Sequence, residues 1–403
     1  MSIHSLMFGW EYPPLHLGGL GVACHGLVQG LLKNGVRVTL VLPHPHSAEE
    51  EHDVLAPTSA QMKSVQIPSI MGPYDTHRQY LHKITTISKE MQQVYGSDLP
   101  EAVAHFTAMS AEITKDVHAD IVHCHDWMTY GAGIEAAKQH QKPLVAHIHA
   151  TELDRTHFHP NQWIYEMERS GLAAAHRIIA VSNYTKGILT EHYGIPAEKI
   201  RVVHNGSSEE HLQPDHAITA SVRHQRHPMV LFLGRMTIQK GPVQFLEMAT
   251  KVHAVRPDVQ FVMAGEGDMM NEVIDRACKM GLGNCMVFTG KVSSKEAKKL
   301  YQQAECFVMP SLSEPFGLVA LEAIAHDTPV IVSRQSGVSE VMAHGFTVDF
   351  WDTDKMADCV LTILREKSLA MQLKIEAPRS LRNLRWEQQA GHVRSIYLDL
   401  ITA

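Results

Sequence analysis

Two carboxylates flank an apolar segment late in the chain. The stretch SLSEPFGLVALEAIAHDTPVIVS, residues 311–333, carries Glu314 and Glu322 eight positions apart. A carboxylate accepts two hydrogen bonds at once, so it suits the vicinal hydroxyls of a sugar ring or of a ribose. One site could therefore offer a carboxylate to each sugar of a nucleotide-sugar. The alternative is that both residues merely favour the N-terminal half of a helix.

The residues between the two carboxylates predict a helix start. Pro315 favours a turn followed by the first turn of a helix. The backbone N–H groups of Phe316, Gly317 and Leu318 would then lie at the positive end of the helix dipole, where they can bind phosphate or hydroxyl oxygens. The first carboxylate would lie in the loop before this helix and the second would lie inside it.

Two cations follow the first predicted strand in the second half of the chain. In LFLGRMTIQKGP, Arg235 and Lys240 are five residues apart. Arg can bind a diphosphate through its bidentate fork, and Lys can bind it as a point charge. The alternative is a solvated loop with ordinary surface charges. The AGEGD turn at 264–268, which also follows a strand, is expected to be a plain tight turn without a direct catalytic role.

Glycines crowd the turn after the first predicted strand. In PPLHLGGLGVACHGL, Gly18, Gly19 and Gly21 precede a helix. They would let a phosphate approach the backbone at the helix N-terminus, although tight packing alone would also explain them. Their spacing differs from the G-x-G-x-x-G of dinucleotide folds, and no acidic residue closes the second strand, VRVTLVLP. The sequence therefore disfavours a nicotinamide enzyme.

Histidines offer a second candidate site. His123 and His125 lie two positions apart on one predicted strand, and His147 and His149 lie two apart on the next, so each pair projects to one side. Together with Asp126 they could form a metallohydrolase site. The chain contains 28 histidines, however, and histidines at strand ends are often hydrogen-bonded structural groups.

The overall composition is ordinary for a folded protein, and the length is that expected of two domains. The chain has 403 residues, of which 44% are hydrophobic and 20% charged. A net charge of −7 and the lack of any Lys/Arg block disfavour nucleic-acid binding. Six cysteines without a C-x-x-C pair suit reduced thiols in the cytoplasm. Neither a leader peptide nor a membrane-spanning run is predicted, while contact with a membrane surface stays open.

Short β-branched strands alternate with amphipathic helices in both halves of the chain. A polar segment at about 207–228 separates the halves and is interpreted as a linker. This pattern predicts two doubly wound α/β domains, residues 1–212 and 213–385, that face one another. Helices are predicted at 19–34, 161–175, 183–193, 242–255, 268–280, 294–303 and 317–326. Because ligands of such sheets bind at the carboxyl ends of the strands, the active site is expected in the cleft between the domains.

The motifs together resemble a known family. They are EPFGLVALEA with its E-x7-E spacing, GR-x4-KG, HDW at 125–127, VSNYT, NG and the early GGLG. In this order they resemble the retaining glycosyltransferases of family 4, the group 1 transferases with the GT-B fold of two facing Rossmann-like domains. FGWEYPP, HATELDR and SGVSE are similar to a branch near the bacterial and archaeal glycogen synthases. The resemblance implies that a helix at about 386–403 crosses back to the first domain.

The resemblance implies roles for the donor-side residues. Arg235 and Lys240 would bind the diphosphate of the donor, and Glu322 would bind the ribose of its nucleotide. Glu314 would hold the transferred sugar together with the backbone of residues 316–318.

On the opposite side of the cleft, the resemblance assigns two further contacts. The turn at Gly18 and Gly19 would approach the phosphates, and His149 would hydrogen-bond the donor sugar near the reacting centre. Neither a metal ion nor another cofactor is implied. The sequence departs from the family pattern in two places. The usual NGVD reads NGSS at 205–208, which concerns the contacts near the hinge. The Lys expected before the Gly-Gly turn is replaced by His16-Leu17, which concerns the glycogen synthase assignment.

The implied activity is transfer of a hexose to a hydroxyl acceptor. Glucose from UDP-glucose or ADP-glucose, with a glucan as acceptor, is favoured within this class. Retention without an obvious nucleophile implies attack on the face from which the diphosphate leaves. Three alternatives remain open from the sequence: a GT-B epimerase or hydrolase, a non-catalytic nucleotide-sugar binder, and the metallohydrolase.

Overall fold

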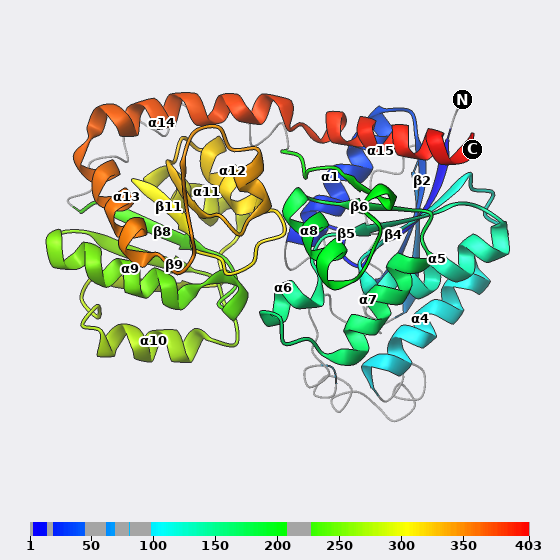
Figure 1. The fold of residues 1–403 in the computed structure, drawn as a ribbon, viewed down its shortest axis with the longest axis horizontal. Coiled ribbons are helices and arrows are strands. Elements are labelled where there is room, and N and C mark those ends of the chain that lie inside the picture. The colour runs from blue at the N-terminus through cyan, green and yellow to red at the C-terminus, as the bar shows by residue number, and fades with distance from the viewer. Residues whose placement is uncertain are drawn as a thin grey trace.

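The chain forms two α/β units, each built on a parallel sheet with helices on both faces (Figure 1). The computed structural model describes residues 3–13, 19–44, 62–68, 80, 98–207 and 227–402. The fold class expected from the sequence, two facing Rossmann-like domains, is confirmed. The predicted boundary between residues 212 and 213 and most of the predicted linker lie outside the described residues.

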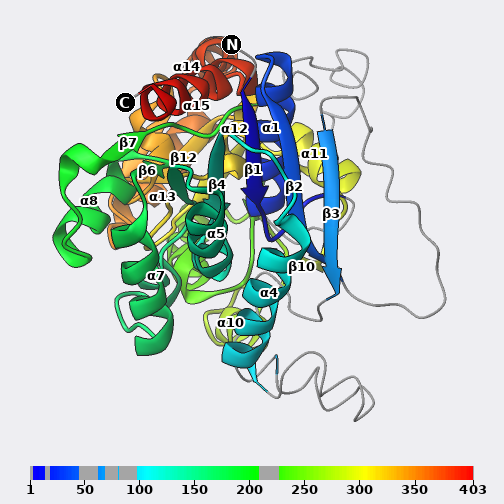
Figure 2. The same ribbon diagram turned by 90° about the vertical axis from the view of Figure 1, so that its right-hand side faces the viewer.

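The first sheet has seven strands in the order β3-β2-β1-β4-β5-β6-β7. Figure 2 shows β3 at its outer edge, beside β2. The strands are β1 His4–Phe8, β2 Arg37–His44, β3 Met62–Pro68, β4 Ile121–His125, β5 Leu144–Ile148, β6 Arg177–Ala180 and β7 Ile200–Val202. The helices are α1 Gly19–Lys33, α4 Leu99–Thr114, α5 Trp127–His140, α6 Glu152–Thr156, α7 Gln162–Ala174, α8 Asn183–His192 and the 3-10 helix η1 Ala197–Lys199.

The second sheet has six strands in the order β10-β9-β8-β11-β12-β13. The strands are β8 Met229–Leu233, β9 Gln260–Ala264, β10 Met286–Gly290, β11 Cys306–Met309, β12 Val330–Ser333 and β13 Phe346–Val348. The α-helices are α9 Pro242–Val255, α10 Met270–Lys279, α11 Ser294–Gln303, α12 Leu318–Ala325, α13 Thr353–Arg365, α14 Lys367–Ser380 and α15 Trp386–Ile401. The 3-10 helices are η3 Ile238–Lys240, η4 Gly337–Glu340 and η5 Leu381–Asn383.

Each sheet separates two apolar cores, because successive residues of a strand point to opposite faces. In β1, Leu6 and Phe8 belong to the core that includes residues of α4 and α5, whereas Met7 belongs to the core beneath α1 and α15. In β8, Phe232 and Leu231 divide in the same way between two cores. Burial on both faces explains why these strands are continuously apolar.

Both sheets reverse their winding direction next to their first strand. Strand β1 has β2 on one side and β4 on the other, and β8 lies in the same way between β9 and β11. In doubly wound sheets this switch point leaves a crevice at the carboxyl ends of the strands, where ligands bind. The fold therefore provides one such crevice in each domain.

The C-terminal helices connect the two domains along one side of the molecule (Figure 1). Helix α15 packs against α1, where Gly26 and Gly30 lie under Trp386 and Ala390. A Cβ atom on Gly30 would lie only 2.5 Å from the backbone oxygen of Trp386, so glycine permits the close approach of the two helices. The Asn34 side chain adds a hydrogen bond of 2.8 Å to the oxygen of Glu387.

Several elements are absent from the pattern-based prediction. Edge strand β3 contains few β-branched residues, and helix α5 is buried along much of its length, so its apolar periodicity is weak. Helix α14 contains Pro378, which argues against a helix in sequence-based prediction. Among the described helices, none combines the length and the apolar character needed to cross a membrane.

Candidate active site

A pocket of about 710 Å³ opens between the two domains, at the switch points of both sheets. The described residues to which the resemblance assigns a role all line it: Gly19, His149, Arg235, Lys240, Glu314, Phe316, Gly317, Leu318 and Glu322. Gly21, from the same glycine-rich turn as Gly19, does not line it. Gly18 lies outside the described residues. The fold thus brings together groups from both halves of the chain.

Lys240 and Glu314, which are expected to bind different parts of the donor, form an ion pair with each other. Lys240 Nζ lies 2.7 Å from Glu314 Oε2, and the Ser311 hydroxyl donates to the same carboxylate oxygen at 3.2 Å. Both charged side chains are largely buried, so each offsets part of the desolvation cost of the other. A donor phosphate entering the pocket would have to share or replace this lysine contact.

Gly241 allows the turn that carries Lys240 to approach the loop that carries Glu314. Lys240 ends the 3-10 turn η3, and Gly241 follows with a φ of 69°. A Cβ atom on Gly241 would lie 2.0 Å from the carbonyl oxygen of Pro310. Both the left-handed backbone and the close approach therefore require glycine after the lysine.

Helix α12 begins at Leu318, between the two carboxylates, close to the predicted start at residue 317. Gly317 precedes it with a φ of 107°, which favours glycine. The first N–H groups of a helix lack partners within it, so the start of α12 offers hydrogen-bond donors to the pocket it lines.

Glu322 lies inside α12, is half-buried and lines the pocket. The Tyr301 hydroxyl donates to its Oε2 at 3.0 Å. Burial raises the pKa of Glu322 to about 7, and the tyrosine hydrogen bond opposes this shift only in part. The carboxyl group can therefore exchange its proton near neutral pH, and hydrogen bonds from ribose hydroxyls would favour its ionised form.

The loops after β8 and β9 pack backbone against backbone and place two further charges in the pocket. A Cβ atom on Gly265 would lie 2.0 Å from the oxygen of Gly234, and Met236 N donates to Glu266 O at 2.9 Å. Both Arg235 and Glu266 line the pocket. The AGEGD turn is thus tight, as expected, but it also contributes a pocket residue that the sequence analysis did not propose.

His149 is held from both sides at the end of β5. Its backbone N–H donates to Asp126 Oδ1 at 2.7 Å, and its ring Nε2 lies 2.9 Å from His125 Nδ1. Burial lowers the pKa of His149 to about 3, so the ring is neutral at physiological pH. Its Nδ1 has no hydrogen-bond partner among the described residues. A bound sugar hydroxyl could supply that partner.

A buried charge network supports the segment that follows His149. Arg155 lines the pocket and donates through Nη1 to the oxygen of Ala150 at 2.9 Å. Its remaining nitrogens contact Glu152 at 3.1 Å and Glu168 at 2.6 Å. The guanidinium group therefore fixes the backbone immediately after His149 rather than projecting freely into the pocket.

Sequence reasoning assigned no role to Arg155, although the HATELDR segment contained a signal for its placement. Thr151 and Asp154 form a capping box at the start of α6, a pattern readable as T-x-x-D. Helix α6 then places Arg155 beside the pocket. Trp10, which also lines the pocket, lies in the FGWEYPP segment after β1.

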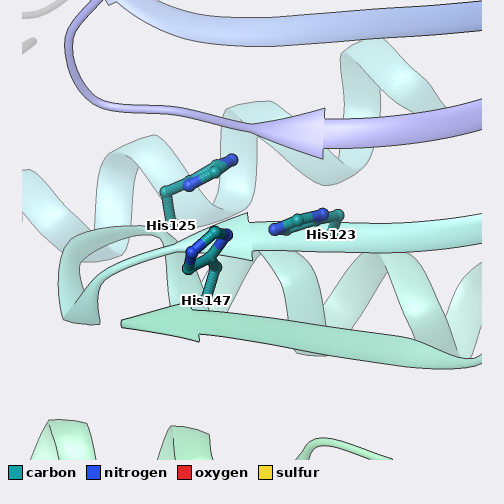
Figure 3. Close-up of side chains that lie close together, drawn as sticks. All are labelled: His123, His125 and His147. Atoms are coloured by element: carbon teal, nitrogen blue, oxygen red, sulfur yellow. The ribbon is translucent and has the colours of Figure 1, made fainter. Parts of the chain in front are cut away.

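The histidines of the metallohydrolase hypothesis lie close together in the core (Figure 3). One ring nitrogen from each of His123, His125 and His147 lies within 4.8 Å of the others. The rings are stacked, however, with angles of 17° to 28° between their planes. The lone pairs of nearly parallel rings do not converge on one point, so this arrangement is poorly suited to binding a single metal ion.

Burial also keeps these stacked rings neutral. It lowers the pKa of His123 to about 3 and the pKa values of His125 and His147 well below their ordinary value. At its far end the stack contacts Tyr397 of α15, whose hydroxyl hydrogen-bonds His123 Nδ1. The stack therefore links the helix that returns to the first domain with the His149 side of the pocket.

Motifs from the two domains meet beside the pocket. Glu340 of SGVSE accepts hydrogen bonds from the backbone N–H groups of Asn183 and Tyr184, at 2.9 and 2.7 Å, and thereby caps helix α8 of the first domain. His204 Nε2 lies 3.0 Å from the same carboxylate. Burial alone would raise the pKa of Glu340, but these partners lower it, so the carboxylate is ionised.

The turn at 205–208, where the family pattern changes, lies against the start of α15 in its described part. Asn205 lines the pocket. A Cβ atom on Gly206 would lie 2.6 Å from the backbone nitrogen of Trp386, and Ser207 N donates to Leu384 O at 2.6 Å. The second serine, Ser208, lies outside the described residues.

The two facing sheets with a pocket between them are typical of the GT-B fold. A family model described as Glycosyl transferases group 1 matches residues 216–380, and one described as Glycosyltransferase Family 4 matches residues 17–211. A glycosyltransferase of Methanocaldococcus jannaschii is 30% identical over 348 residues, which cover 84% of this chain and 82% of the relative. The chain belongs to this glycosyltransferase family, as the resemblance implied.

Two further comparisons concern the branch and the fold. A glycogen synthase of Mycobacterium tuberculosis is 26% identical over 415 residues, which cover 98% of this chain and 94% of the relative. The structure of sucrose-phosphate synthase from Thermosynechococcus elongatus is similar, with a TM-score of 0.77, 19% identity and 99% of each chain covered. At that identity the structural likeness concerns the fold.

Proposed function

We propose that the protein is a retaining hexosyltransferase that moves glucose from UDP-glucose or ADP-glucose to a hydroxyl group of a glucan. The observation that carries the proposal is the convergence of Lys240, Glu314, Glu322 and His149 on one pocket between the domains. Its volume of about 710 Å³ lies in the range of small-molecule and cofactor sites. The reaction is proposed to need no metal ion and to take place in the cytoplasm.

Two cations of the second domain line the pocket where, in the proposed reaction, a leaving diphosphate would develop negative charge. Arg235 and Lys240 line the side formed by the second domain, together with the first turn of α12. Fixed cations and preorganised N–H groups stabilise this charge more strongly in the transition state than in the ground state. These groups can supply the stabilisation that a metal ion would otherwise provide.

Neither carboxylate is proposed as a nucleophile. Glu314 is paired with Lys240, and Glu322 accepts a hydrogen bond from Tyr301. In the proposed step the acceptor oxygen attacks C1 of the sugar on the face from which the diphosphate departs. The bond from C1 to the phosphate oxygen breaks, the new glycosidic bond forms, and the acceptor proton passes to the leaving phosphate oxygen. Neutral His149 would hydrogen-bond the sugar during this step.

Two observations support the proposed substrates and compartment. The glycogen synthase relative aligns over almost the whole chain, which favours a glucose donor and a glucan acceptor. All six cysteines are unpaired and only Cys278 is exposed, which suits a reducing compartment.

The test is incubation of the purified protein with a panel of nucleotide-sugars, with and without malto-oligosaccharide acceptors. We expect nucleotide release that requires both a glucosyl donor and an acceptor, and an α-linked product by NMR. Activity should persist after exhaustive chelation. Lys240→Ala should weaken donor binding and slow turnover together, because its charge is needed before and during bond cleavage. Release that does not depend on acceptor would replace the proposal with a hydrolase, and a strict metal requirement would overturn the cation-based mechanism.

A further inference from the structure

Five aromatic rings form a continuous row from one domain to the other beside the pocket. The row, hereafter the aromatic row, consists of His192, Phe158, His157, Phe350 and Trp351. Ring centroids of successive members lie 5.0, 6.4, 6.2 and 4.9 Å apart. The first three residues belong to the first domain and the last two follow β13 of the second, so the contact between His157 and Phe350 bridges the domains.

The row is open to solvent where a sugar could reach it. Phe158 is 41% exposed and Trp351 is 62% exposed. They are the only aromatic residues among the large apolar side chains found exposed in the part of the chain that the structure describes. His192 is exposed as well, whereas His157 and Phe350 are half-buried and support their neighbours. Exposed aromatic side chains gathered in one row, rather than scattered singly, indicate a binding surface.

The backbone holds this arrangement in an unfavourable conformation. His157 and Phe158 have φ values of 50° and 63°, in the left-handed region that residues with a Cβ atom usually avoid. Hydrogen bonds from Phe158 N to Leu153 O, at 3.0 Å, and from His159 N to Thr156 O, at 3.2 Å, hold the turn in place. Two consecutive left-handed residues thus hold a phenylalanine at the surface.

The chain leads from the candidate active site to the row within a few residues. His157 follows helix α6 and lies two positions after Arg155, which lines the pocket. A polymer whose end occupies the acceptor position would therefore need to cross only a short distance to reach the row. The row lies outside the pocket itself, since none of its members lines that pocket.

We propose that the aromatic row binds the glucan chain of the acceptor, away from the end that reacts. This inference rests on the proposed function and extends it to a second binding surface. The C–H faces of pyranose rings pack against aromatic faces, and burying them removes apolar surface from water. The histidines His157 and His192 add polar nitrogens that suit sugar hydroxyls. Nucleic-acid bases also stack on aromatic rings, but such sites combine stacking with a positive groove, and this chain has a net charge of −7.

The test measures glucan binding apart from catalysis. Maltoheptaose binding is measured by calorimetry, and glycogen binding by mobility in native gels, on the full-length protein without donor. We expect Phe158→Ala and Trp351→Ala each to weaken binding by about tenfold, the loss expected from one stacking contact. Val255→Ala is the matched control, because Val255 is 63% exposed and ends α9, apart from the row. Its binding should equal that of the unaltered protein, and all three variants should keep the melting temperature.

A kinetic comparison separates this inference from the proposed function. Both row variants should raise the KM for glycogen while leaving the KM for maltose and for the nucleotide-sugar unchanged. If the unaltered protein binds maltoheptaose through the row but releases no nucleotide from any donor, the proposed function fails and the binding surface stands. Glucan binding that is undetectable, or equal in the row variants and in Val255→Ala, overturns the inference. A loss of self-association with unchanged glucan binding would assign the row to a protein interface and would also overturn it.

Discussion

At the scale of single residues, burial shifts the pKa of the Glu322 carboxyl group so that the group is near its midpoint of ionisation at neutral pH. Burial raises its pKa to about 7 from an ordinary value of 4.5, which the unfolded chain retains. Between these pH values the carboxyl group ionises in the unfolded chain but stays protonated in the folded one. The free energy of unfolding therefore falls as the pH rises from about 4.5 to 7, by an amount on the order of 2–3 kcal/mol.

We expect Glu322→Gln to increase the free energy of unfolding more at pH 8 than at pH 5. The amide removes the partly desolvated negative charge, and its oxygen can still accept the hydrogen bond from Tyr301. Urea unfolding at the two pH values measures the difference. The same variant should bind a nucleoside diphosphate more weakly, because a neutral amide accepts hydrogen bonds from ribose less strongly than a carboxylate does. A stability difference that is identical at both pH values would disprove the raised pKa.

The role proposed for His149 also concerns a single residue, because its expected contribution to turnover is one positioned hydrogen bond. We expect His149→Ala to retain most of the nucleotide affinity while turnover falls by about 10²-fold, the effect of losing one transition-state contact. Since the pKa of His149 is about 3, its ring should not titrate in the pH profile of turnover between pH 5 and 9.

His159→Ala is a suitable control for this substitution, because His159 is exposed and does not line the pocket. Nucleotide affinity, turnover and melting temperature should be measured on both variants. Near-normal turnover in a stably folded His149→Ala protein would exclude a catalytic role for this histidine.

At the scale of elements, the start of α12 depends on one glycine. Gly317 has a φ of 107°, and a Cβ atom there would lie 2.9 Å from Met309 Cε and 3.3 Å from Glu314 Cγ. We expect Gly317→Ala to lower the free energy of unfolding by about 1–2 kcal/mol and to weaken donor binding by moving Glu314. Donor binding and urea unfolding measured on the same protein test both effects.

The chain offers a matched glycine as a control. Gly187 lies inside α8, and a Cβ atom there would meet no atom within 4 Å. Gly187→Ala should therefore leave donor binding unchanged and increase the free energy of unfolding by about 0.5–1 kcal/mol, because alanine favours the helix. If both substitutions had the same effect, the special requirement at Gly317 would be wrong.

At the scale of the whole molecule, the position of the two domains depends on contacts across the cleft. Glu340 caps helix α8 of the opposite domain and lies beside His204. Because its pKa is lowered, its contribution to domain closure should be present at neutral pH and should be lost as the pH falls through that lowered value.

We expect Glu340→Ala to open the cleft of the donor-free protein, which X-ray scattering would detect as a larger radius of gyration. Donor should restore closure at a higher concentration, so its KM should rise. Glu272→Ala is the control, because Glu272 forms an exposed pair with Arg276 within one helix and should affect neither measurement. An unchanged radius of gyration in Glu340→Ala would remove this contact from the control of closure.

Residues close in sequence determined much of the fold by themselves. Apolar runs bounded by turn residues predicted alternating strands and helices in both halves of the chain. The E-x7-E segment predicted a helix that begins between its carboxylates, as α12 does. These features are readable because strand and helix periodicity, proline and glycine preferences and capping act over a few neighbouring positions. Elements whose local signals are weak, such as α5 and the proline-containing α14, were missed for the same reason.

Only the tertiary structure determines which of these residues contact one another and how their pKa values are shifted. The pairing of Lys240 with Glu314 spans 74 positions of sequence and depends on the close approach of Gly241 to Pro310. The raised pKa of Glu322 depends on burial, which the packing of whole helices and strands determines. The aromatic row joins His157 to Phe350 across two domains. Contacts of this kind arise from many weak packing interactions acting together, so no short sequence pattern encodes them.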